Sequence, residues 1–184
     1  MSSEAIWYLT RSSALVSWVL LVAAVVWGAA ASGRMIERRG ARRWLVDTHS
    51  TLGALGVALA VLHIVTAVAD SYVGLRWVDA IVPGAASWEP WAMSLGVIAV
   101  WSLAIVQVTS RLRHRIPRRV WHAAHMLSYL ACWTLSLHAV LVGTDLTNRT
   151  VAFSAFMLVV VASAVSFERA RTAHARATRI AARS

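Results

Sequence analysis

The chain has 184 residues, of which 59% are hydrophobic and only 8 are acidic, and this composition excludes an ordinary soluble domain. All 18 basic residues are arginine, and the net charge of +10 would suit nucleic acid if the arginines formed one basic surface. They instead flank long apolar blocks, as basic residues do on the cytoplasmic side of membrane helices. The composition therefore predicts the lipid bilayer as a partner and no nucleic acid.

The first apolar block covers residues 14–31 and contains no charge. Only Glu4 and Arg11 precede it, whereas five arginines lie between residues 34 and 43. A signal peptide carries its positive charge before the apolar segment, so we interpret this block as a retained helix with its N-terminus outside.

The second block, residues 44–70, is long enough to cross a bilayer and carries two histidines, His49 and His63. The loop that follows, residues 71–90, contains little positive charge and is predicted to lie outside. Its tryptophans, Trp77 and Trp88, are typical of interfacial anchors. The alternative is a docking or substrate-binding surface.

Three further blocks complete the chain. Residues 91–110 contain no histidine and are predicted to serve packing, and the basic loop 111–119 is predicted to be cytoplasmic. Residues 121–142 carry His122 near their start and two histidines further into the span, His125 and His138. A fifth span is expected at 151–167. The fold class is thus an all-α membrane bundle of five transmembrane helices, N-terminus out and C-terminus in, over residues 1–167, followed by a basic cytoplasmic tail at 168–184.

The four intramembrane histidines form pairs by depth. The second and fourth spans run in the same direction in this topology, and each histidine lies six or seven residues from the nearest charged flank, about 9–11 Å of helix. This counting pairs His49 with His125 near the cytoplasmic side and His63 with His138 near the outer side.

Paired histidines on parallel membrane helices predict two b-type haems. The iron of a haem takes an axial imidazole from each side, and two strong axial ligands favour electron transfer over oxygen binding. We therefore expect His49 and His125 on an inner haem iron and His63 and His138 on an outer one. His122, three residues after Arg119, is the alternative inner ligand. A different interpretation is four isolated histidines that bond to the backbone or to serine.

Helix geometry leaves one discrepancy. Fourteen positions bring His49 and His63 to within about 40° of one face, whereas thirteen positions leave His125 and His138 about 140° apart on a straight helix. Arginines near the ends of the spans are candidate partners for haem propionates: Arg42, Arg43, Arg118 and Arg119 on the inner side, and Arg76 and Arg149 on the outer side.

The sequence resembles the ferric reductase-like transmembrane domain. The likeness lies in the two histidine pairs, with 13 and 12 residues between their members, and in segments 7–11, 70–73, 79–83 and 143–145. It is similar to short actinobacterial members of a family that includes the membrane parts of NADPH oxidases, ferric reductases and the haem subunit of the methionine sulfoxide reductase system. The resemblance covers roughly residues 6–167 and implies two b haems with the ligand pairs named above.

The resemblance also shapes the functional expectation. Larger relatives carry a flavin and nicotinamide domain, but this sequence contains no glycine-rich dinucleotide fingerprint. We therefore expect an electron-transfer subunit of an oxidoreductase in a bacterial cytoplasmic membrane, with a separate donor, a flavoprotein or quinol, and an extracytoplasmic acceptor. One alternative is a reductase for Fe(III) or another acceptor at the outer loop. Another is a haem-free subunit that anchors or assembles a larger complex.

Overall fold

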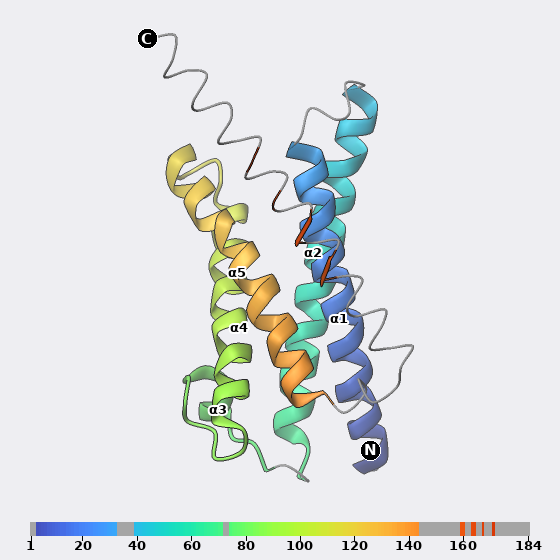
Figure 1. Cartoon of the computed structure of the whole chain (residues 1–184), viewed down its shortest axis with the longest axis vertical. Coiled ribbons are helices and arrows are strands. Elements are labelled where there is room, and N and C mark those ends of the chain that lie inside the picture. Colours follow the sequence, from blue (N-terminus) through green and yellow to red (C-terminus); the bar gives the residue numbers. More distant parts are fainter. Residues whose placement is uncertain are drawn as a thin grey trace.

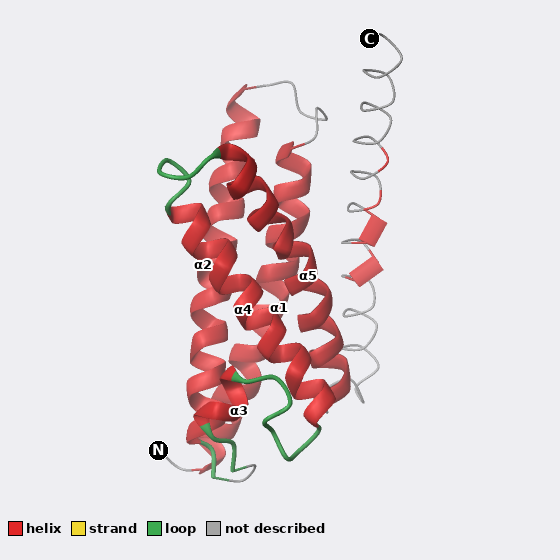
Figure 2. Cartoon of the chain, turned by 90° about the vertical axis from the view of Figure 1, so that its left-hand side faces the viewer, coloured by secondary structure: helices red, strands yellow, loops and turns green. Residues whose placement is uncertain are grey.

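A computed structural model of the chain describes residues 3–32, 39–71 and 74–143, and six single positions beyond them (159, 160, 163, 164, 167 and 171). The described chain is all-α (Figures 1 and 2). Its helices are α1 (Ser3–Ser32), α2 (Arg39–Ala69), α3 (Trp77–Ile81), α4 (Pro90–Arg111) and α5 (Arg118–Val142). Four of them, all except the short α3, are long and apolar enough to cross a bilayer.

The long helices alternate in direction. α1 and α4 run one way and α2 and α5 run the other, so the two histidine-bearing helices are parallel (Figure 1). The closest packing is between antiparallel neighbours, α1 with α2 and α4 with α5. Each histidine-bearing helix is therefore paired with a long helix that has no histidine.

Two of the helices extend further than the apolar blocks. α1 begins at Ser3 rather than near residue 14. In this first part of the helix, Thr10 and Ser13 donate their hydroxyl hydrogens to carbonyls one turn back (2.9 Å and 2.6 Å), so their polar groups are satisfied within the helix. α2 begins at Arg39, so Arg42 and Arg43 stand on its first turns instead of in a loop.

Buried polar contacts fix the helices against one another. The Ser17 hydroxyl of α1 donates to the Gly56 carbonyl of α2 (2.8 Å), and a Cβ at Gly56 would lie 2.8 Å from Leu21, so this glycine permits close approach of the two backbones. The Trp18 indole of α1 donates to the Ser136 hydroxyl of α5 (2.9 Å). Trp18 and Val22 form the centre of the apolar core.

Residues 74–89, which precede α4, fold onto it. The Ile81 carbonyl accepts a hydrogen bond from the Trp101 indole (2.9 Å), and the Gly84 amide donates to the Ser94 hydroxyl (2.8 Å). Asp79 is buried and accepts hydrogen bonds from the side chain and the amide of Arg76. The segment is therefore an ordered cap at the end of the bundle where α2 ends.

The described chain confirms the all-α membrane bundle, with four of the five predicted spans present as long apolar helices. The fifth span, at 151–167, lies outside the described residues except for a few positions, and the tail at 168–184 does so almost entirely.

Candidate functional site

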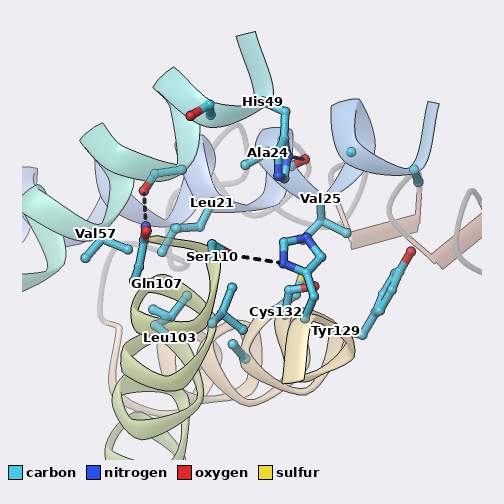
Figure 3. Close-up of a pocket in the computed structure, with 18 of the residues that line it drawn as sticks. Leu21, Ala24, Val25, His49, Val57, Leu103, Gln107, Ser110, Tyr129 and Cys132 are labelled. Atoms are coloured by element: carbon cyan, nitrogen blue, oxygen red, sulfur yellow. Dashed lines mark hydrogen bonds between the residues drawn. The ribbon is translucent and has the colours of Figure 1, made fainter. Parts of the chain in front are cut away.

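A cavity of about 370 Å³ lies among α1, α2, α4 and α5, a volume within the usual range for sites that bind small molecules and cofactors. Its walls are mainly apolar, with Leu21, Val57 and Leu103 among the side chains that line it (Figure 3). His49 enters it from α2 and His125 from α5.

The two imidazoles of this cavity are neighbours. The ring centroids of His49 and His125 lie 5.9 Å apart, and the ring planes are inclined at 67°. Imidazole nitrogens bind first-row metals at about 2.0–2.1 Å, so rings at this separation can approach one metal from two sides. His122 is exposed and does not line the cavity, which leaves His125 as the histidine of α5 at this level.

A main-chain carbonyl fixes the tautomer of His49. Its Nδ1 lies 2.7 Å from the Ala24 carbonyl oxygen of α1 (Figure 3). Because a carbonyl oxygen only accepts, Nδ1 carries the proton, and the lone pair of the neutral ring is on Nε2. His125 Nδ1 lies 3.4 Å from the Ser110 hydroxyl of α4, a longer and weaker contact. Histidines that ligate metals are commonly oriented in this way by a partner on the other ring nitrogen.

The other two histidines lie at the opposite end of the same helices. His63 Nδ1 lies 3.0 Å from the Thr10 carbonyl oxygen of α1, and His138 Nδ1 lies 2.8 Å from the Ala92 carbonyl oxygen of α4. Both rings therefore also carry their proton on Nδ1. His63 and His138 are close enough to interact electrostatically. The geometric grouping is the one predicted from the charged flanks, whereas the role of the four histidines as haem ligands stays a prediction.

Glycines make room for two of these rings. A Cβ at Gly28 of α1 would lie 2.9 Å from the ring atoms Cε1 and Nδ1 of His49, and a Cβ at Gly96 of α4 would lie 2.9 Å from Nδ1 of His138. Gly53, which lines the cavity one turn after His49, faces open space. The backbone thus forms a recess behind two imidazoles and leaves the cavity wall bare beside one of them.

The arginines predicted to hold propionates differ in position. Arg42 lines the cavity, and its Nε donates to the Ala31 carbonyl (3.5 Å). Arg43 is exposed and pairs with Asp47 on α2 (3.8 Å). Arg118 lines a smaller cavity, of about 290 Å³, next to the first.

The remaining candidates are not placed at the histidines. Arg119 is exposed and lines neither cavity. Arg76 donates two side-chain hydrogen bonds to Asp79, so its guanidinium is engaged in the cap segment. Arg149 lies outside the described residues.

Sequence reasoning missed several residues of the site. Arg113 and Trp121 line the cavity, and the Trp121 ring stacks on His125 with centroids 5.2 Å apart. Ser110, Gly28 and Gly96 were not predicted either. The one signal in the sequence was Trp121, which stands one helical turn before His125.

The fold and the membrane-spanning helices define the class: this is a multi-pass α-helical membrane protein with two pairs of histidines at two levels of the bundle. Comparisons with protein families, with curated proteins and with solved structures find no match.

The residues present are compatible with a haem in the inner cavity. Two imidazoles with centroids 5.9 Å apart line one mainly apolar cavity, a recess at Gly28 accommodates one of them, and arginines line the same cavity. This donor set suits an iron whose remaining positions a macrocycle fills.

Proposed function

We propose that this protein is a b-type cytochrome that moves electrons across a bacterial cytoplasmic membrane through two bis-histidine haems. The observation that carries the proposal is the pair His49 and His125, which meet across one cavity from two parallel helices. His63 and His138, near each other at the other end of these helices, are assigned to the second haem. The ferric reductase-like transmembrane domain remains the family to which we assign the chain.

The protein's own contribution is to hold neutral imidazoles in fixed orientations. Carbonyls of Ala24, Thr10 and Ala92 keep the proton on Nδ1 of three histidine rings. The basic Nε2 of each ring then points away from the helix that supplies the carbonyl. The inner cavity is lined mainly by apolar side chains, which lower the polarity around a group bound there. Bound haem would supply the one-electron chemistry.

We propose that electrons flow outward, and the proposed topology assigns the donor and the acceptor to opposite sides of the membrane. With the basic loop at 111–119 in the cytoplasm, a separate flavoprotein or quinol delivers electrons at the level of His49. An acceptor, protein or small molecule, receives them outside at the level of His63. This chain is the electron-transfer subunit in that arrangement.

Haem content tests the proposal directly. The pyridine haemochrome assay on purified protein is expected to give about two haems per chain, with the low-spin spectra of bis-histidine ligation. A preparation without a Soret band would contradict the proposal and favour the haem-free anchor. A value of about one haem would remove one of the two ligand pairs.

Substitution of the outer histidines tests their pairing. His63→Ala and His138→Ala are each expected to remove the same haem and to leave the inner one, because both residues serve one iron. His122→Ala is the matched control and is expected to keep both haems, since His122 is exposed and outside the cavity. Loss of different spectral components in the two outer variants would show that the pairing by depth is wrong.

A further inference from the structure

The Trp121 indole has a donor with no acceptor. Trp121 lies in the first turn of α5 and lines the inner cavity, and its ring stacks on His125 at an interplanar angle of 27°. Its Nε1 is buried and has no hydrogen-bond partner among the described residues, a property shared there only with Nε1 of Trp27. An unpaired buried N–H is costly, so an acceptor is expected when the site is in use.

The same end of the cavity is cationic. Among the described residues that line the cavity, the only arginines are Arg42 and Arg113, and none is acidic. Arg113 and Trp121 also line the adjacent smaller cavity, so they stand together where the two spaces meet. A ligand that fills this space would be apolar along the helices and anionic at the end where Arg113 and Trp121 lie.

We propose that the Trp121 indole N–H and the Arg113 guanidinium bind a carboxylate of the ligand in the inner cavity. This inference rests on the proposed function for the identity of the ligand: if the ligand is haem, the carboxylate is one of its propionates. An arginine supplies charge and an indole supplies one directed donor, and a hydrogen bond to a carboxylate is about twice as strong as one between neutral groups. Trp121 thereby positions the ligand and also packs on one axial imidazole.

Two conservative variants separate these roles. Trp121→Phe removes the N–H and keeps an aromatic ring on His125, and Arg113→Gln removes the charge. Trp27→Phe is the matched control, because Trp27 also has a buried, unpaired indole N–H but does not line the cavity.

The readout is the rate at which the inner haem is lost from detergent-solubilised protein to excess apomyoglobin. Trp121→Phe and Arg113→Gln are each expected to lose it about tenfold faster than the wild type, the loss that corresponds to one charge-assisted hydrogen bond. Trp27→Phe is expected to match the wild type. Equal loss rates in all four proteins would overturn the inference and leave the proposed function intact.

Haem dimethyl ester, whose propionates are masked, distinguishes carboxylate binding from packing. After reconstitution with the ester, the difference in loss rate between the wild type and the Trp121→Phe and Arg113→Gln variants is expected to shrink, because an ester carbonyl carries no charge and accepts only the weaker, neutral hydrogen bond. A tenfold difference that persists undiminished with the ester would show that the charge of the carboxylate is not recognised and would overturn the inference.

Metal-free protoporphyrin IX separates this inference from the proposed function. It has both carboxylates and no iron to ligate, so its binding, followed by porphyrin fluorescence, is expected to weaken in Trp121→Phe even if the histidines bind no iron. If the wild type bound haem but Trp121→Phe bound protoporphyrin IX as tightly as the wild type, the carboxylate site would be contradicted and the proposed haem function would stand. Failure of both compounds to bind the wild type would contradict both proposals.

Discussion

Each of three histidines is oriented by a carbonyl from a neighbouring helix. His49 and His63 of α2 contact carbonyls of α1, and His138 of α5 contacts a carbonyl of α4. The sequence predicted which histidines share a level because charged flanks and helical rise suffice for that count. The carbonyl contacts were not predictable, since every residue has a carbonyl and only packing selects Ala24 or Ala92.

Gly28 provides a test of the inner site at the scale of one residue. Gly28→Ala would place a Cβ 2.9 Å from His49 Nδ1, in the space that the hydrogen bond to Ala24 requires. The ring must move, so the haem content is expected to fall from about two to about one per chain while the helices remain folded. Haemochrome stoichiometry together with far-UV circular dichroism measures both quantities.

The control for this variant is Gly40→Ala. Gly40 lies on the same helix as His49, and a Cβ there would meet no atom within 4 Å. Full haem content is expected. If Gly28→Ala also retained both haems, the position of His49 against α1 would not matter for ligation.

At the scale of the elements, the helices without histidines do more than pack. We interpreted residues 91–110 as a packing helix, but α4 contacts two of the histidines of α5, His125 through Ser110 and His138 through Ala92. Its antiparallel course puts these two contacts at opposite ends. The 140° separation of His125 and His138 expected on a straight helix thus does not prevent both rings from reaching the same neighbour.

The hydrogen bond between Trp18 and Ser136 joins α1 to α5. Both residues are buried, and the Ser136 hydroxyl also donates to the Cys132 carbonyl, so Trp18→Phe leaves that serine with a partner. Side-chain hydrogen bonds between membrane helices contribute about 0.6 kcal/mol on average, with a maximum of about 1.7 kcal/mol. The free energy of unfolding of Trp18→Phe, measured in mixed micelles, is expected to fall by an amount in this range. A double-mutant cycle that combines Trp18→Phe with Ser136→Ala measures the coupling energy of the two residues. A value of zero would contradict a stabilising role for this hydrogen bond.

The cap segment responds to pH through Asp79. The hydrogen bonds from Arg76 hold the pKa of Asp79 below its ordinary value of 3.8, and the short helix α3 (Trp77–Ile81) begins at this pair. A carboxylate with a lowered pKa stabilises the fold at neutral pH, and its contribution is lost as the pH falls through that lowered value. The segment is therefore expected to stay ordered down to about pH 4 and to loosen below it.

Hydrogen exchange of residues 77–84, corrected for the intrinsic effect of pH, measures this change. Asp79→Asn is expected to raise exchange at neutral pH and to remove the dependence below pH 4, because the amide cannot ionise. Exchange that is identical in the variant and the wild type would exclude a role for the Arg76–Asp79 pair in the cap. The sequence did not predict α3, since five residues give no periodic pattern.

For the whole molecule, hydrophobic length and charge predicted the class of fold but not its interior. Exposed apolar residues on the long helices, such as Leu55, Val61 and Ile105, give these helices the apolar outer surface that a bilayer requires. The cationic end of the inner cavity was harder to predict. The basic loop at 111–119 contains several arginines, and the sequence does not indicate which of them reaches the cavity. The turn after α4 brings Arg113 to it, and Arg119 does not line it.

Orientation in the membrane decides which pair of histidines faces the cytoplasm and therefore a cytoplasmic donor. The segment at 74–90 contains one arginine and two acidic residues, whereas the loop at 111–119 is rich in arginine, so the positive-inside rule places the first outside and the second in the cytoplasm. In a Cys132→Ser background, Ser87→Cys is expected to react with a membrane-impermeant maleimide in intact cells. Arg115→Cys is expected to react only after the membrane is permeabilised. Both positions are exposed, so the difference in labelling reports sidedness rather than burial, and the reverse pattern would place the donor at the level of His63 instead of His49.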